Sequence, residues 1–496
     1  MALVGRILKH VLFALLIILA TLLGVRAVES TRADPLGPWH SEAPDDATAQ
    51  QIETMDWAQW IAAENRVFQQ VETEMASKLG PGHKIPQNRY WSGSPMHAPS
   101  LATNWNRSFT LAPEGPARGA AVMLHGMTDT PYSLRHVAKH YQQRGFHVVA
   151  IRLPGHGTVP AGLARATAED WQAATSLAVR EAVRRAPGLP LHLAGYSSGA
   201  ALAVSHALDA SADASLGMPA RLVLISPMID LRRFARFAGF AGWPAILPPF
   251  YRAAWFTIAP EYNPFKYNSF PVNAGSQAHR LTALMTKRLD AAEQDNRISR
   301  LPPVLGFLSV ADATVNASSV RTDLFDRLPA NGSEMILIDI NRNAYAGPFI
   351  RPSAFARVRT FLPAAPRRYR TSIIASGEIG SGTSVLRIFE PGSIAETRGS
   401  VPMAYPRDIF SLSHVALPFP LTDGLYGTQP DPNDRQGIAL GTLVPRGENG
   451  VLSVGMGTFN RASSNPFFPW FLDRLDSVLP PPPPTGTPVA VAPSQP

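Results

Sequence analysis

The feature that most constrains the fold is a regular alternation of short apolar runs with helical patterns over residues 119–227. The apolar runs, typical of buried strands, lie at 120–124, 147–151, 191–194 and 222–225. The stretches between them, typical of helices, lie at 133–143, 168–185 and 198–208. Strict alternation predicts an α/β fold, a parallel sheet with helices on both faces. In such sheets functional residues gather at the carboxyl ends of the strands.

The third apolar run ends in the sequence Gly195-Tyr196-Ser197-Ser198-Gly199. Two glycines allow a tight turn from strand to helix, which holds the middle serine exposed and strained at the helix N-terminus. An ordinary glycine–serine turn is the alternative. The turn lies between a predicted strand and a predicted helix, which favours a catalytic serine over an ordinary turn. We therefore predict that Ser197 is a nucleophile.

Two more glycine-containing loops follow the first and second apolar runs. They are His125-Gly126-Met127 and Pro154-Gly155-His156-Gly157. An acyl carbonyl that becomes an oxyanion needs two preorganised backbone N–H groups, and we expect Met127 and Ser198 to supply them. His125 and His156 are interpreted as structural side chains that shape these loops.

In this order and spacing, the His125-Gly126 loop, the 154–157 loop and the 195–199 turn resemble the α/β-hydrolase superfamily. The nearer resemblance is to its branch of lysophospholipases, monoacylglycerol lipases and serine aminopeptidases, and it covers residues 105–345 best. The resemblance implies an α/β-hydrolase fold with a mostly parallel central sheet. It further implies a serine hydrolase that cleaves carboxylic esters through an acyl-enzyme, with no metal or organic cofactor.

The resemblance also implies that the nucleophile, an acid and a histidine follow one another along the chain. Of the thirteen histidines, only His206, His279 and His414 follow Ser197. The first two fall within helical patterns. We therefore predict that His414, in a strand-like run that enters a loop, is the base.

Asp312 is the predicted acid, because it stands just past the apolar run 304–310, where the superfamily places its carboxylate. Asp339, which follows another apolar run, is the alternative. The 102 residues that separate Asp312 from His414 exceed what one helix and one strand need. We therefore expect an insertion at about 343–408, an added hairpin or small lobe near the active-site face.

Residues 232–270 include twelve aromatic residues in 39, about three times the average of the chain. The resemblance places a cap over the active site here, at about 231–300. An aromatic cap would line an apolar pocket, and we expect Trp243, Trp255 and Tyr196 to contact the ester or lipid substrate. The alternative is that the aromatic residues form the cap's own small core.

The first 28 residues have the pattern of an export signal or a membrane anchor. Arg6 and Lys9 precede an apolar run from Val11 to Val25, and Arg26 follows it. A run of 15 residues spans about 22 Å as a helix, short of a hydrocarbon core of about 30 Å, which favours a cleaved signal peptide. A retained anchor, with membrane association through this segment, is the alternative. In both cases we expect the protein in the cell envelope.

The rest of the chain is predicted as a linker and helical extension at 29–104, a hydrolase domain at 105–479, and a disordered proline-rich tail at 480–496. The chain has no cysteine, which excludes a disulfide scaffold, thiolate metal sites and a cysteine nucleophile. Only six of the 45 basic residues are lysines, and the arginines are dispersed, which argues against a nucleic-acid partner.

Two other functions are compatible with these residues. A serine aminopeptidase would need an acidic pocket for the amino group of its substrate, and the aromatic segment offers only Glu261. A catalytically inactive binding module in the envelope would be expected to lack a member of the set Ser197, Asp312 and His414, which is intact. An esterase, lipase or lysophospholipase is therefore favoured, with a substrate class that rests on the resemblance.

Overall fold

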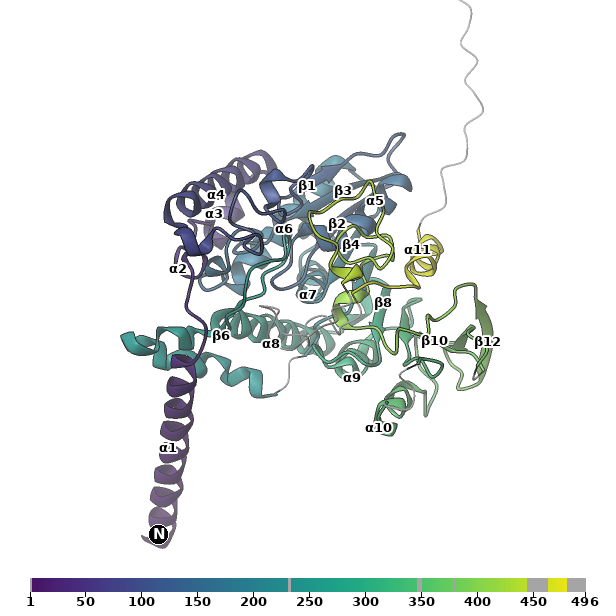
Figure 1. The fold of residues 1–496 in the computed structure, drawn as a ribbon. Helices are drawn as coiled ribbons and strands as arrows, with labels where there is room; N and C mark the ends of the chain where they lie inside the picture. The colour runs from purple at the N-terminus through teal and green to yellow at the C-terminus, as the bar shows by residue number, and fades with distance from the viewer. Residues whose placement is uncertain (1, 231–232, 346–349, 379, 444–462, 480–496) are drawn as a thin grey trace, which may run out of the picture.

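The structure is a computed structural model that describes residues 2–230, 233–345, 350–378, 380–443 and 463–479 (Figure 1). The proline-rich tail at 480–496 lies outside the described residues. At the centre is a ten-stranded sheet with the order β1-β3-β2-β4-β5-β8-β9-β10-β11-β12. Its strands are β1 (Phe109–Leu111), β2 (Gly119–Leu124), β3 (Phe146–Ile151), β4 (Leu191–Tyr196), β5 (Arg221–Ile225), β8 (Val304–Ser309), β9 (Glu334–Ile338), β10 (Arg370–Ser376), β11 (Ser384–Phe389) and β12 (Glu396–Val401).

The middle of the sheet, from β3 across to β10, is parallel throughout. Antiparallel pairing occurs at its two ends, where β1 pairs with β3 and β11 lies between β10 and β12. Parallel strands are covered on both faces, which is why their sequences are apolar almost without interruption. Every residue of β2, β4, β8 and β9 is buried. The predicted α/β-hydrolase fold with a mostly parallel sheet is confirmed.

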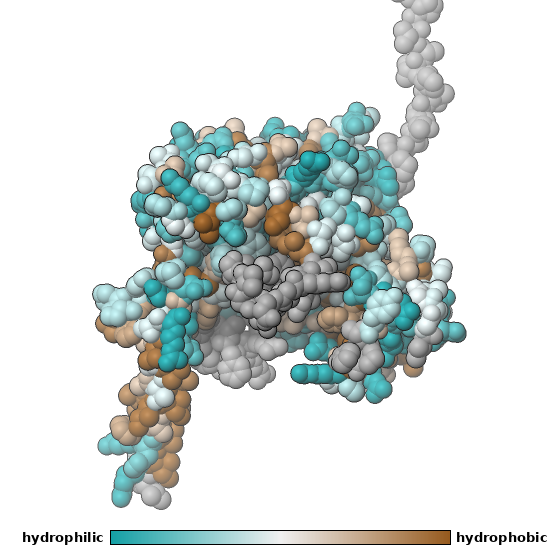
Figure 2. Space-filling model, in the orientation of Figure 1, coloured by the Kyte–Doolittle hydropathy of each residue, from teal (hydrophilic) through white to brown (hydrophobic). Residues whose placement is uncertain are grey.

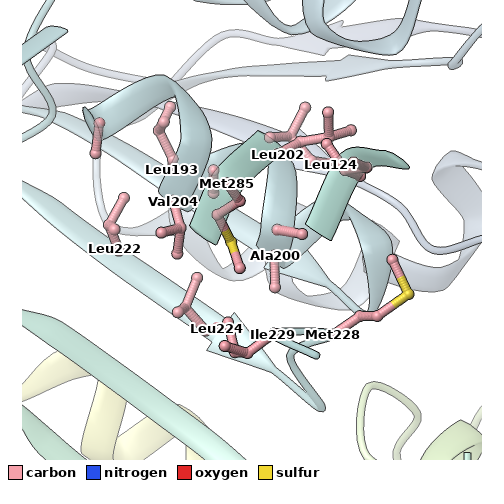
Figure 3. Packing of buried hydrophobic residues seen from close by; sticks show 14 of the residues in the cluster. Leu124, Leu193, Ala200, Leu202, Val204, Leu222, Leu224, Met228, Ile229 and Met285 are labelled. Atoms are coloured by element: carbon pink, nitrogen blue, oxygen red, sulfur yellow. The ribbon is translucent and has the colours of Figure 1, made fainter. Parts of the chain in front are cut away.

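Helices pack on both faces of the sheet. One face carries α6 (Ala168–Arg185), α7 (Ser198–Ala212) and α8 (Val272–Gln294), and the other carries α5 (Arg135–Gln143) and α11 (Phe468–Asp476). Alternate residues of a strand serve the two clusters, as Val122 and Met123 of β2 do. Figure 3 shows the first cluster, where Leu124 lies with Leu202 of α7 and Met285 of α8.

The helical extension predicted within 29–104 contains two main helices. These are α3 (Ala49–Thr54) and α4 (Trp57–Lys78). The break has a local cause, because the Asp56 carboxylate accepts the backbone N–H of Gln59 at 2.8 Å and so begins a new helix. α3 packs against α6 of the hydrolase domain, as Figure 1 shows.

A buried charge cluster joins this extension to the sheet. Arg152, just past β3, is fully buried and pairs with two carboxylates of the extension. Its Nη1 lies 2.7 Å from Asp46 Oδ2, and its Nε lies 3.1 Å from Glu64 Oε1. Asp46 Oδ2 also accepts the backbone N–H of Gly155, in the loop that follows β3. The extension therefore supports a loop at the carboxyl edge of the sheet.

The segment expected to form the cap is divided in the structure. Its first part comprises η6 (Arg233–Ile246), η7 (Pro248–Ala254) and a two-stranded sheet of β6 (Trp255–Thr257) and β7 (Phe270–Pro271). The side chains of 231–238 lie outside the described residues. Its second part is α8, whose Leu281 and Met285 belong to the main core. We use the name cap for the first part, from η6 to β7.

The insertion between the predicted acid and base contains a hairpin, the first of the two forms expected for it, but it is not separate from the sheet. Its strand β10 pairs in parallel with β9 and so continues the central sheet, and β11 and β12 add a hairpin beyond it.

Short helices complete the described chain: α2 (Pro38–Ser41), η1 (Pro81–His83), η2 (Ala98–Ser100), η3 (Pro131–Leu134), η4 (Pro160–Gly162), η5 (Ala214–Leu216), η8 (Arg297–Arg300), α9 (Ala317–Ser319), η9 (Val320–Leu324), η10 (Phe325–Arg327), α10 (Pro352–Phe355), η12 (Arg357–Phe361), η13 (His414–Ala416) and η14 (Leu440–Thr442).

The amino-terminal helix α1 (Ala2–Thr31) extends away from the body of the molecule (Figure 1). An 18-residue window of this helix has a mean hydropathy of 2.6 and is almost entirely exposed, and the helix appears as a brown column in Figure 2. By length and composition this helix could cross a membrane, and a signal sequence has the same properties.

Replacing Asp46 should destabilise the whole domain. The variant Asp46→Ala leaves the buried Arg152 cation with Glu64 alone, so we expect the free energy of unfolding to fall by about 3 kcal/mol. Chemical denaturation followed by circular dichroism measures it. The matched control is Asp45→Ala, on the neighbouring exposed carboxylate, which should change stability by less than about 0.5 kcal/mol. Equal effects of the two variants would contradict the argument.

Candidate active site

Ser197 occupies a sharp turn between β4 and α7. Its backbone has φ 54° and ψ −116°, a left-handed conformation that strains a residue with a side chain. The flanking glycines make this turn possible. A Cβ on Gly199 would overlap with the carbonyl oxygen of Leu124 on β2, and a Cβ on Gly195 would overlap with the first turn of α7. The turn therefore presents Ser197 at the carboxyl edge of the sheet, at the N-terminus of α7.

The loop after β2 passes directly beside this serine. A Cβ on Gly126 would lie 3.1 Å from the Cβ of Ser197, so the backbone of this loop comes within contact distance of the predicted nucleophile. Among the described residues, the amides of Met127 and Ser198 have no hydrogen-bond acceptor. Two backbone donors next to a serine are the arrangement that stabilises an oxyanion.

His125 and His156 are buried side chains that hold the neighbouring loops. His125 Nδ1 lies 2.9 Å from the carbonyl oxygen of Gly126, and its Nε2 accepts the backbone N–H of Leu153 at 3.0 Å. This pattern requires a neutral ring with its proton on Nδ1. Burial lowers the pKa of His125 far below its usual value and lowers that of His156 to about 4. Both rings are therefore neutral at pH 7 and shape the edge of the sheet.

His414 and Asp312 meet at the same edge. His414 Nδ1 lies 2.7 Å from Asp312 Oδ2, and both side chains are buried. The other Asp312 oxygen accepts the N–H groups of Thr314 and Val315, which fixes the carboxylate. The ring of Tyr196 lies 5.4 Å from that of His414, so the pair stands next to the turn that carries Ser197.

The alternative acid, Asp339, has other partners. Its Oδ1 accepts the backbone N–H of Ile340 at 2.8 Å, and its Oδ2 lies 3.8 Å from Arg342. Burial raises the pKa of Asp339. Of the two candidate carboxylates, Asp312 is therefore the one that the structure pairs with His414.

The chain before His414 is not a strand, contrary to the strand-like pattern of 410–415. Residues 404–413 form turns and bends, and His414 begins η13. The backbone oxygens of this stretch bond to side chains and loops instead of to a neighbouring strand. Asn341 binds the carbonyls of Ile409 and Phe410, and Ser309 Oγ binds that of Leu412 at 2.8 Å. The apolar alternation here reflects a partly buried loop, in which Leu412 packs in the core and Phe410 is exposed.

A charged cluster holds the segment that follows His414. The Asp423 carboxylate accepts the Tyr132 hydroxyl at 2.8 Å and lies 3.0 Å from Arg135 Nη1 and 2.9 Å from His136 Nε2. Burial would raise the pKa of Asp423, but Arg135 and His136 lower it to about 2. His136, Asp423 and Asp434 have the spacing of a metal site. Arg135 pairs with both carboxylates, however, so the chain supplies its own cation.

The three predicted substrate contacts lie in different surroundings. Tyr196 is buried, and its hydroxyl lies 3.5 Å from the His414 carbonyl. Trp255 is buried with its ring 4.8 Å from that of His40, at the junction of cap and extension. Trp243 is half exposed, and its ring lies 4.6 Å from that of Phe240. A pocket-lining position for these residues stays a prediction.

Sequence reasoning missed the pair of Asp129 and Lys266, which lie 3.2 Å apart. Asp129 is buried in the loop after β2, and burial raises its pKa although Lys266 opposes the change. The pair ties this loop to the cap, since Tyr267 N–H also binds the Thr128 carbonyl. In the sequence, Asp129 stands out because it closely follows the Gly126 loop. That position does not indicate that its partner is Lys266, 137 residues away.

Comparison with known proteins shows what most of this site is similar to. Residues 115–339 match the model of the family described as serine aminopeptidase, S33. This segment is similar to the S33 family of α/β-hydrolases. The predicted resemblance is confirmed, and the S33 match includes Ser197, Asp312, Met127 and Ser198, whereas His414 lies beyond its end.

Individual relatives match shorter or more divergent stretches of the chain. A curated thermostable monoacylglycerol lipase of Bacillus sp. (strain H-257) is 40% identical over 62 residues, which are 12% of this chain and 24% of the relative. The chain thus matches about a quarter of that relative's length. A solved structure of the metagenome-derived lipolytic enzymes LipS and LipT is 23% identical, covers 45% of this chain and 83% of that chain, and has a TM-score of 0.36. A monoglyceride lipase from Saccharomyces cerevisiae is 16% identical over 46% of this chain and 81% of its own, with a TM-score of 0.34.

A side chain at Gly199 should be incompatible with the turn. In Gly199→Ala the new Cβ would meet the backbone of Leu124, which cannot move without disturbing the sheet. We expect the free energy of unfolding to fall by about 3 kcal/mol or more, measured by chemical denaturation. Gly80→Ala is the control, because Gly80 has φ −73° and open space around it. A stable Gly199→Ala protein would show that the helix is less closely packed.

The buried histidines predict a loss of stability in mild acid. Because the folded pKa of His156 is about 4 and the unfolded value is about 6.5, the unfolded chain binds the extra proton between these values. Stability is therefore complete above pH 6.5 and falls as the pH drops toward 4, by up to about 1.4 kcal/mol per pH unit. In His156→Asn, whose amide can still donate to the Pro154 carbonyl, denaturation curves at pH 7 and pH 5 should differ less than in the parent. If the stability of the variant differs between pH 7 and pH 5 as much as that of the parent, His156 does not cause the loss of stability in acid.

Proposed function

We propose that this protein is a serine hydrolase of carboxylic esters, with Ser197 as nucleophile, His414 as general base and Asp312 as the acid that orients the base. The observation that carries the proposal is the buried His414–Asp312 hydrogen bond of 2.7 Å beside the strained Ser197 turn. A carboxylate on Nδ1 fixes the proton there and leaves Nε2 free to accept the proton of Ser197.

The reaction would proceed in two steps. Ser197 Oγ attacks the ester carbonyl while His414 takes its proton, and the Met127 and Ser198 amides bind the oxyanion of the tetrahedral intermediate. Collapse expels the alcohol, which receives the proton from His414, and leaves an acyl-enzyme. Water activated by His414 then attacks the acyl-enzyme and releases the acid, which regenerates Ser197.

The burial of Glu261, the acidic residue of the cap, favours ester substrates over peptides. Glu261 is buried, and its carboxylate accepts the backbone N–H groups of Asn268 and Ser269 at 3.0 Å and 2.8 Å. Burial raises the pKa of Glu261, so this carboxyl is committed to the fold of the cap. The curated relative is named a monoacylglycerol lipase, which supports a monoacyl ester as the substrate.

Removing the serine hydroxyl should abolish ester hydrolysis. For the full chain in detergent micelles we expect Ser197→Ala to lower kcat/KM for p-nitrophenyl esters, from acetyl to palmitoyl, by at least about 10⁴-fold. Ser205→Ala, on the same helix, is the matched control, because the Ser205 hydroxyl has no hydrogen-bond partner among the described residues. Activity that survives Ser197→Ala, or a folded parent inactive on every ester, would refute the proposal.

The two candidate acids can be separated by amide substitution. Asp312→Asn keeps the shape of the side chain but favours the wrong ring tautomer of His414, so kcat should fall by about 10⁴-fold. Asp339→Asn keeps the oxygen that accepts the Ile340 N–H and should change kcat by less than a factor of about three, because Asp339 does not contact His414. The reverse order of effects would transfer the assignment to Asp339.

A further inference from the structure

The cap exposes an unusual concentration of large apolar side chains. Scattered apolar residues are normal on a protein surface, but a dense group marks an interaction site. Six of them lie within the 17 residues from 240 to 256, and Ile246 is 81% exposed. We call this group the interfacial surface; it consists of Phe240, Trp243, Ile246, Leu247, Tyr251 and Phe256.

The end of α1 is bonded to this same part of the cap. Arg26, in the last turns of α1, donates to the carbonyl oxygens of Ala253 and Trp255. In return Arg252 Nη1 binds the carbonyl of Ala33 at 2.7 Å and that of Thr31 at 3.5 Å, just past the end of the helix. Figure 1 shows the teal cap segments at the level where α1 leaves the body. The apolar helix therefore emerges from the cap rather than from a separate linker.

The dimensions of α1 place the cap at a membrane surface. The apolar run from Val11 to Val25 spans about 22 Å, and the long side chains of Lys9 and Arg26 at its two ends reach toward the two headgroup layers of a hydrocarbon core of about 30 Å. Basic residues before an apolar span stay on the cytoplasmic side. The residue at the outer boundary, Arg26, is the one that bonds to the cap. Tryptophan and tyrosine, present in the interfacial surface as Trp243 and Tyr251, prefer the headgroup layer.

We propose that α1 is a retained anchor and that the interfacial surface of the cap rests in the outer headgroup layer of the bilayer that α1 crosses. The partner is thus a lipid surface. The cap begins close to Ser197, because Met228, which precedes the cap in the chain, donates its N–H to the Ser197 carbonyl at 3.1 Å. Resting on the proposed function, the inference is that the substrate is an acyl ester taken from the membrane.

The fold of the segment around Arg26 argues against removal of α1. Removal of a signal peptide would cut the chain near Ala27, a small residue just after the apolar run, but proteolysis acts on extended, exposed chain. Here α1 continues as a helix to Thr31, Ala27 and Ser30 are buried, and Arg26 is bonded to the cap. Cleavage there would break the joint between anchor and cap. The intact mass of protein extracted from host membranes should therefore include residues 1–26, and their loss would overturn the proposal.

Depth in the membrane can be measured without any reference to catalysis. The chain has no cysteine, so a single introduced cysteine carries one environment-sensitive fluorophore. We compare Ile246→Cys, in the interfacial surface, with Leu189→Cys, an exposed position before β4 at the opposite edge of the sheet. Both full-length proteins are reconstituted in phosphatidylcholine vesicles.

The probe at position 246 should be quenched several-fold more by nitroxide-labelled phosphatidylcholine than the probe at 189, and should be protected from aqueous iodide. Equal quenching of both probes by iodide would overturn the proposal. This readout does not depend on hydrolysis, so it stands even if the protein is not an esterase.

A paired activity measurement tests the link to substrate. The double variant Ile246→Ser and Leu247→Ser should hydrolyse soluble p-nitrophenyl butyrate like the parent, yet hydrolyse a long-chain monoacylglycerol in phosphatidylcholine vesicles several-fold more slowly. Equal loss on both substrates, or no loss on either, would refute membrane delivery. If the parent hydrolyses neither substrate, the proposed function fails, and the probe result decides the membrane contact separately.

Discussion

The candidate site depends on the close approach of α7 to the end of β2. Gly199 has no side chain, so the first turn of the helix reaches the Leu124 carbonyl, and Ser197 is forced into a left-handed conformation between helix and strand. The same approach places the loop after β2 beside the serine. Two backbone amides and a hydroxyl thus converge because two elements of the sheet layer touch, with no need for a flexible segment to close over them.

His414, the hydrogen-bond partner of Asp312, comes from a distant part of the chain. His414 follows an insertion that extends the sheet by β10 to β12, and it still returns to the edge where Asp312 stands. Its path is fixed from both sides. Before it, Asn341 and Ser309 bind the backbone, and after it Asp423 pairs with Arg135 near the loop that follows β2. Extra chain is accommodated because these fixed points lie on β8, in the loop after β9 and on α5.

The amino-terminal part is integrated with the domain in the same manner. The buried Arg152 cluster attaches the extension to the end of β3, and Arg26 and Arg252 attach α1 to the cap. In each case a guanidinium joins segments that are far apart in sequence. These three arginines thus connect the extension to the sheet and α1 to the cap.

Local patterns in the sequence determined the sheet, its helices and the sharp turn at Ser197, because strand burial and glycine spacing act over a few residues. Asp312 and Asp339 both follow an apolar run, and only the resemblance to the superfamily favoured Asp312. Local pattern was misleading at 410–415, where the apolar alternation belongs to a partly buried loop, and it left open whether 1–28 is an anchor. Only the tertiary structure paired Asp312 with His414, joined the extension to Arg152 and brought α1 onto the cap. Those contacts link residues about a hundred or more positions apart, and no short-range propensity specifies which of them will meet.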